Sequence, residues 1–142
     1  MSVSNVLTTE QNEVERGWIQ AFYNTLNVDS FDIERWFEKY FENDASVTYN
    51  NDPPYKGYND LSAHILQLRQ KLSVKYTVKH VDVVSDRIYV EIDATVIRKN
   101  DPEKKEIHLS ELAVFYKKIN ENKISSLKIY VDPTPLLEKN KT

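Results

Sequence analysis

The chain of 142 residues contains no cysteine, a single methionine and only two glycines. Without cysteine there is no disulfide framework, no thiol nucleophile and no zinc site built on thiolates. No apolar run approaches the roughly 20 residues that a membrane-spanning helix needs, so we expect no membrane partner. The first thirteen residues carry neither a basic flank nor an apolar stretch. We therefore expect no secretory signal, and a cytoplasmic protein.

A strong excess of charge of either sign is also missing. The chain has 19 basic and 22 acidic residues, a formal net charge of −3. This balance does not favour binding to a polyanion, so we expect no nucleic-acid partner. With 40% hydrophobic residues the chain is long enough to bury a core without a metal or a disulfide. We predict one domain over residues 1–142 with flexible tails at 1–9 and 138–142, and no cofactor.

Apolar residues at a spacing of three and four predict helices in the first half of the chain. Thr8 or Thr9 can cap the first helix, and Asp32 or Ser30 the second. The first helix has an apolar face of Val14, Trp18, Ile19, Phe22, Tyr23 and Leu26. The second has one of Ile33, Trp36, Phe37, Tyr40 and Phe41, and should end at Asn43 and Asp44. A third is expected after the turn residues Asn59 and Asp60, and should end at Leu72.

Alternating apolar and polar residues predict strands at 45–49, 75–84, 88–96, 106–117 and 123–131. Pro53 and Pro54 stop the first of these, because proline lacks the backbone donor that a sheet requires. Three helices followed by hairpin-linked strands form an α+β pattern. We expect the helices to pack on a strongly curved, mainly antiparallel sheet and to leave an internal pocket.

Two stretches of the chain resemble a known family. The run "WFEKYFENDASVTYNNDPPYKGYNDLSAHI" at 36–65 and the later run "NENKISSLKIYVDPTPL" are similar to the nuclear transport factor two-like superfamily. Its SnoaL-like branch includes polyketide cyclases and ketosteroid isomerases. The resemblance covers roughly residues 10–137 and implies a cone-shaped, cystatin-like α+β barrel. It does not select a function, because this fold also serves hydrolases, transport adaptors and ligand-binding modules.

The resemblance allows the isomerase mechanism to be tested residue by residue. The general base of the ketosteroid isomerases is an aspartate, and the matching position here is Tyr49. Their oxyanion donors fall near Phe22, with Tyr23 adjacent, and near Leu112 or Val114, with Glu111 one residue from that register. Because that mechanism needs a carboxylate as base, we do not expect steroid isomerisation by this route.

Glu111 is the sharpest polar candidate for acid–base chemistry. It shares a period-two stripe with apolar residues of its strand, and on an apolar wall its ionised form would be disfavoured. The opposite stripe is equally acceptable as the inner face, and would leave Glu111 in solvent. The first stripe contains Ile107, Leu109, Ala113 and Phe115, and the second His108, Ser110, Leu112, Val114 and Tyr116.

His64 and Tyr49 are the other two catalytic candidates. His64, on the third helix, could shuttle a proton or bind a ligand, or could be a half-buried histidine with an ordinary partner. Tyr49 could orient a substrate. Several aromatic side chains could line the pocket and bind the ligand, or could simply pack the core. These are Trp18, Phe22, Tyr23, Trp36 and Tyr130.

Two functions of different classes follow. The first is a SnoaL-like pocket protein, cyclase or isomerase, that takes a small apolar or aromatic ligand. The second is a non-catalytic adaptor that forms a homodimer through its sheet. The face offered for this pairing carries Tyr89, Glu91, Asp93, Thr95 and Ile97.

Overall fold

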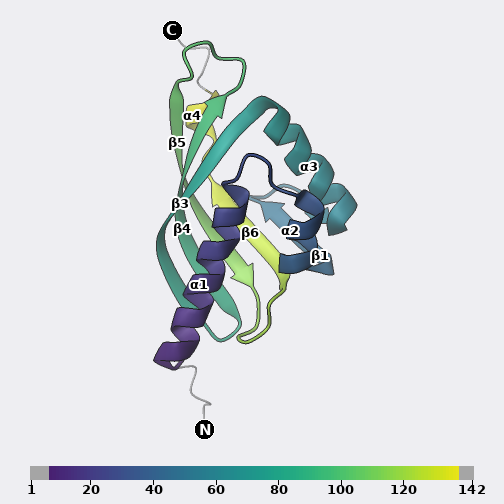
Figure 1. Cartoon of the computed structure of the whole chain (residues 1–142), viewed down its shortest axis with the longest axis vertical. Helices are drawn as coiled ribbons and strands as arrows, with labels where there is room; N and C mark the ends of the chain where they lie inside the picture. The colour runs from purple at the N-terminus through teal and green to yellow at the C-terminus, as the bar shows by residue number, and fades with distance from the viewer. Residues whose placement is uncertain (1–6, 138–142) are drawn as a thin grey trace.

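The computed structural model describes residues 7–137, so the expected tails lie almost entirely outside it. Four helices and six strands follow one another along the chain (Figure 1). They are α1 (Thr9–Leu26), α2 (Ile33–Tyr40), β1 (Phe41–Tyr49), β2 (Tyr55–Lys56), α3 (Gly57–Lys71), β3 (Leu72–Val84), β4 (Arg87–Arg98), β5 (Glu106–Tyr116), β6 (Ile124–Val131) and α4 (Thr134–Leu137). Thr9, predicted to belong to the N-terminal tail, is already helical.

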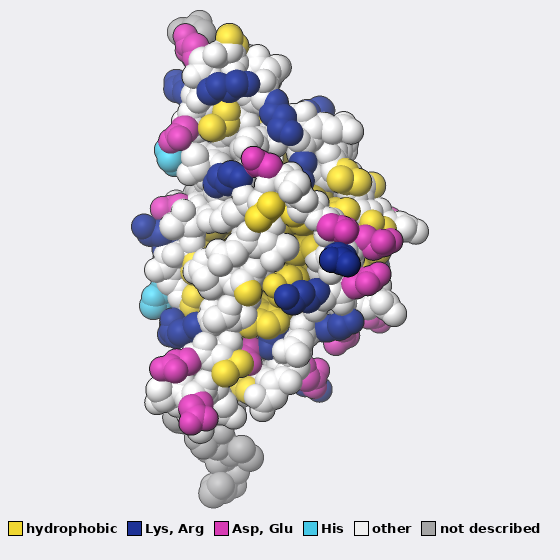
Figure 2. Space-filling model, in the orientation of Figure 1, with side chains coloured by type: hydrophobic (Ala, Val, Ile, Leu, Met, Phe, Trp, Pro, Cys, Tyr) yellow, Lys and Arg dark blue, Asp and Glu magenta, His cyan; other side chains and the backbone are white. Residues whose placement is uncertain are grey.

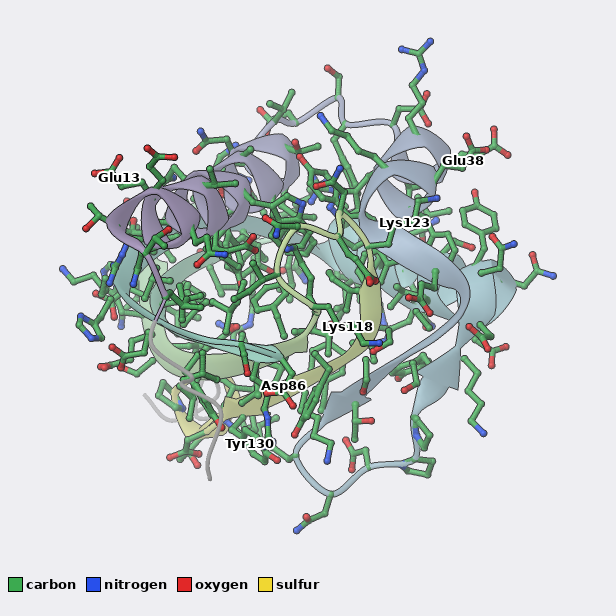
Figure 3. All side chains as sticks on the ribbon, turned by 90° about the horizontal axis from the view of Figure 1, so that it is seen from below. Glu13, Glu38, Asp86, Lys118, Lys123 and Tyr130 are labelled. Atoms are coloured by element: carbon green, nitrogen blue, oxygen red, sulfur yellow. The ribbon has the colours of Figure 1, made fainter. Side chains whose placement is uncertain are left out.

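The strands form one curved sheet in the order β2-β1-β6-β5-β4-β3. The pair β1–β6 is parallel and every other pair is antiparallel. The edge strands β2 and β3 do not pair, so the sheet is open and not a closed barrel. Helices α1 and α2 lie over the hollow side of this sheet (Figure 3). The predicted α+β architecture is confirmed.

Both early helices begin at the residues that sequence chemistry favours. Thr8 and Gln11 form a capping box, in which each side chain accepts a hydrogen bond from the other residue's backbone N–H. The Asp32 side chain accepts from the backbone N–H of Arg35 at the start of α2. Of the proposed alternatives, Thr8 and Asp32 are therefore the caps.

The border between α2 and β1 differs from the prediction. The helix ends at Tyr40 and the strand begins at Phe41, so Asn43 and Asp44 lie within β1. The pairing of β1 with β6 shifts register between Phe41 and Ser46, and this irregularity accommodates the two polar residues. Helix α3 also begins earlier than predicted, at Gly57, whose φ of 75° favours glycine.

The core lies between the helices and the inner face of the sheet. The predicted alternation of β4 is confirmed, because its inward residues Ile88, Val90, Ile92, Ala94 and Val96 are all buried. One ion pair interrupts this apolar interior. Glu15 of α1 and Lys117, just after β5, form a salt bridge and are 2% and 4% exposed.

Among residues 7–137, no helix combines the length and the apolar character required to cross a membrane. The same residues contain no group of three histidine, aspartate or glutamate side chains that could hold a metal ion.

A candidate ligand cavity around Glu111

A cavity of about 210 Å³ lies between the helices and the inner face of the sheet. Its walls are mostly aliphatic and aromatic side chains from all four described helices and from every described strand except β2. The charged residues of the lining are Arg69 and Glu111. A concave apolar pocket with few polar groups is the usual form of a small-molecule site.

Glu111 enters this cavity because β5 presents one of its two stripes to the interior. The residues on the same face of β5 are buried, namely Leu109, Ala113 and Phe115. On the opposite face, Ser110 and Leu112 are exposed. The first of the two alternatives therefore describes the fold. Glu111 pairs with Ile92 of β4 on one side and Val131 of β6 on the other, so its cross-strand neighbours are apolar.

Burial raises the pKa of Glu111 to about 7, because an apolar environment disfavours the ionised carboxylate. Within residues 7–137 no donor forms a hydrogen bond with this carboxyl. At neutral pH the group is thus divided between its acid and base forms, as an acid–base catalyst requires.

Three tyrosines of the cavity wall lie close enough to be affected by the charge of Glu111. Burial and, next, this charge raise the pKa of Tyr23, Tyr49 and Tyr76. All three phenols therefore stay protonated and can donate hydrogen bonds to a ligand. Sequence reasoning missed Tyr76. Its place in the alternation of β3, between Val74 and Val78, was the available signal.

Other predicted binding residues also reach the cavity. Phe22 and Trp36 contribute to its lining together with Tyr23. The indole Nε1 of Trp36 is buried and has no hydrogen-bond partner among the described residues. A buried donor left unpaired costs about 1–3 kcal/mol.

The prediction that Trp18 and Tyr130 line the cavity is wrong. Trp18 packs behind the wall, where its ring lies against Phe115 and under the ammonium of Lys117, 4.9 Å from the ring centroid. Tyr130 is 44% exposed on the side of the sheet away from the helices (Figure 3). Its neighbours Ile129 and Val131 line the cavity instead, and the period of two along a strand explains the difference.

His64 lies beside the cavity and is not part of its lining. Its ring stacks on Tyr55 at 4.2 Å and lies 5.1 Å from the ring of Tyr49. Burial lowers the pKa of His64, and its Nε2 is buried without a partner among residues 7–137. The structure thus brings Tyr49 and Glu111 to one cavity and leaves His64 behind Tyr49.

Arg69 is a second lining residue that sequence reasoning missed. Its guanidinium lies 4.2 Å from the ring centroid of Phe31 and donates hydrogen bonds to the carbonyl oxygens of Leu26 and Val28. These contacts fasten α3 to the segment after α1. Arg69 therefore has a structural role at the cavity edge.

No protein-family model matches the chain, and no curated protein matches it in sequence. Solved structures match it over nearly its whole length. A proposed SnoaL-like polyketide cyclase from Jannaschia sp. CCS1 superposes with a TM-score of 0.73 at 10% identity, covering 97% of this chain and 96% of that one. An NTF2-like protein of unknown function from Burkholderia pseudomallei gives 0.69 at 12% identity, covering 95% and 100%.

The chain has the NTF2-like fold. SalBIII, an epoxide hydrolase/cyclase-like enzyme in pyran ring formation of the polyether salinomycin, superposes with a TM-score of 0.71 at 16% identity. That match covers 88% of this chain and 96% of SalBIII. At these identities the shared feature is the NTF2-like fold itself, and the chemistry has to be argued from the side chains.

Proposed function

We propose that this protein binds a small, largely apolar carbonyl compound in its cavity and that Glu111 exchanges a proton with it. The observation that carries the proposal is the single carboxyl in a mostly apolar wall, with a pKa of about 7. The NTF2-like structures named as cyclases support a reaction on a small molecule in such a cavity.

The chemistry divides between Glu111 and the phenols. The ionised carboxylate removes a proton from the carbon next to the carbonyl, and the electron pair moves onto the carbonyl oxygen. A phenol hydroxyl, from Tyr23, Tyr49 or Tyr76, donates a hydrogen bond to that oxygen and stabilises the developing charge. The protonated Glu111 then returns its proton to the same carbon, or to the far carbon of a conjugated enolate, and is regenerated as the carboxylate.

Ligand stabilisation provides the first test. A panel of apolar cyclic and aromatic ketones is screened by thermal unfolding, because a ligand at 100 times its Kd stabilises the native state by about 2.7 kcal/mol. A binding ketone is then incubated with the protein in D2O, and deuterium uptake next to the carbonyl is followed by NMR.

The variant Glu111→Gln should keep ligand binding and lose most of the deuterium uptake, on the order of 100-fold. The matched control is Glu106→Gln, which removes an exposed carboxylate from the same strand. Uptake that is unchanged in Glu111→Gln would refute the role of Glu111. If no ketone stabilises the protein, the pocket function fails altogether.

A second candidate, a homodimeric adaptor, is supported by the outer face of the sheet. Leu112 and Tyr130 are directly paired across β5 and β6, and are 38% and 44% exposed. Two apolar side chains side by side on an exposed sheet are suited to pairing with a second copy. Sedimentation should then give a dimer, and Leu112→Lys a monomer with the cavity's ligand affinity intact. A monomeric wild-type protein would exclude this candidate.

A further inference from the structure

A second hollow, of about 770 Å³, adjoins the cavity near α4. The two share Leu68, Leu72 and Leu136 in their linings, so the hollow borders the apolar cavity. The hollow lies where α3 ends, β3 begins and β4 leads into its loop. The polar side chains that line the hollow belong to these segments, and none of them is acidic.

Three cations line this hollow, namely Lys71, Arg98 and Lys99. Within residues 7–137 none of the three forms a salt bridge with a carboxylate. Figure 2 shows Lys and Arg side chains gathered at the corresponding upper end of the molecule. Three positive charges thus lie beside an apolar cavity in a protein whose net charge is −3.

The contacts of these cations do not neutralise them. Arg98 donates a hydrogen bond to the carbonyl oxygen of Leu136, and Lys99 donates one to that of Arg69. A carbonyl is a dipole without net charge, so both side chains retain a full positive charge and unused donors. Among residues 7–137, Asp29 and Asp101 feel the charge of these cations, and both are otherwise engaged. Asp29 pairs with Lys75, and Asp101 accepts from the backbone of its own loop.

Lys71 and Lys99 also lie at the C-terminal end of α3, where positive charge stabilises the helix dipole. That role explains a preference for basic residues at this end. It does not require them to surround a hollow that borders the apolar cavity.

We propose that the ligand is an amphipathic anion, whose apolar body occupies the cavity and whose carboxylate, phosphate or sulfate head lies in the hollow between Lys71, Arg98 and Lys99. This inference rests on the proposed function, because it assumes that the cavity takes a ligand. Charge-assisted hydrogen bonds are stronger than neutral ones, so the head group should add both affinity and orientation.

Two probes with the same hydrocarbon chain and different heads test the proposal. Decanoate is ionised at pH 7.5 and decanol is neutral. Calorimetry should give a lower Kd for decanoate than for decanol, by about tenfold. The difference should shrink as NaCl is raised, because salt screens partly exposed charges.

The double variant Lys71→Gln/Lys99→Gln, which keeps Arg98, should remove most of the preference for decanoate and leave the Kd of decanol unchanged. Glutamine retains a donor for the Arg69 carbonyl, so the fold is spared. Lys123→Gln is the control, since this exposed lysine lies in the loop between β5 and β6, at the end of the molecule opposite α4 (Figure 1).

The outcomes separate this inference from the function on which it rests. Equal Kd values for the two probes, or a preference for decanoate that is undiminished in the double variant, would overturn the anionic head and leave the apolar pocket standing. If neither probe binds to the wild-type protein, both the inference and the pocket function fail.

Discussion

Glu111 couples the protonation of the cavity to the stability of the whole chain. Its pKa is raised from 4.5 in the unfolded chain to about 7 in the native state. Between these two pH values the native state binds the proton and the unfolded state does not, so stability falls as pH rises. The full penalty, roughly 3 kcal/mol, is reached above the native pKa.

The variant Glu111→Gln should therefore be more stable than the wild type at pH 8, by about 2–3 kcal/mol. At pH 4, where both states carry a protonated carboxyl, the two proteins should have nearly equal free energies of unfolding. Urea denaturation at a series of pH values measures the difference. The control Glu106→Gln should show no such trend, because Glu106 is exposed. If the difference in free energy of unfolding between Glu111→Gln and the wild type is the same at every pH, then Glu111 ionises in the native state as it does in water.

Single residues also show how far the sequence could lead. Glu111 was a candidate only under one of two face assignments, because both stripes of β5 contain enough apolar residues to form an inner face. The same ambiguity placed Tyr130 inside, although Ile129 and Val131 are the inward residues of β6. A one-residue change of face reverses every side chain of a strand. Pairing with neighbouring strands resolves it, and pairing is not visible locally in the sequence.

At the scale of elements, the ion pair between Glu15 and Lys117 joins α1 to the end of β5. Both side chains are almost fully buried, and the backbone N–H of Asn120 donates a further hydrogen bond, at 3.4 Å, to Glu15 Oε2. The variant Lys117→Met should cost about 3–5 kcal/mol, because it leaves the carboxylate of Glu15 buried without its counter-charge. Denaturant unfolding, with unchanged slope, measures this loss.

The paired variant Glu15→Leu/Lys117→Met distinguishes loss of the ion pair from loss of packing. It should recover most of the stability, since an apolar pair of similar volume avoids the desolvation of two charges. If the paired variant is as unstable as Lys117→Met alone, the cost arises from lost packing around the lysine stem and not from the unpaired charge.

Helix starts that depend on capping by neighbouring residues were predicted correctly. The border between α2 and β1, which has no such local signal, was not. Thr8 and Asp32 cap their helices because the capping chemistry involves neighbouring residues only. The end of α2 was placed too late, at Asn43 and Asp44, because these residues usually terminate helices. In the structure β1 pairs with β6, about 80 residues away in the chain, and this pairing makes Asn43 and Asp44 part of the strand.

At the scale of the molecule, the architecture followed from the order of helices and strands and from resemblance to known proteins. The open sheet curves over α1 and α2 and leaves the cavity on its hollow side (Figure 3). The same curvature could equally have been filled by larger side chains. Whether a cavity remains depends on the summed volumes of side chains from many elements. The sequence alone does not show which side chains share that space.

The cavity itself can be tested by filling it. Val131 lines it and pairs directly with Glu111, so a larger side chain at this position would occupy the space beside the carboxyl. The variant Val131→Phe should keep or raise the free energy of unfolding, by up to about 1 kcal/mol, because it fills empty apolar volume. It should weaken binding of the stabilising ketone by at least about tenfold.

The matched control is Val28→Phe, which adds the same atoms at a position that is 50% exposed and outside the cavity lining. It should leave the Kd of the ketone unchanged. Thermal unfolding with and without the ketone measures stability and binding on the same samples. If Val131→Phe is stable and still binds the ketone with the affinity of the wild type, the ligand occupies another place on the molecule, and Glu111 then has no access to it.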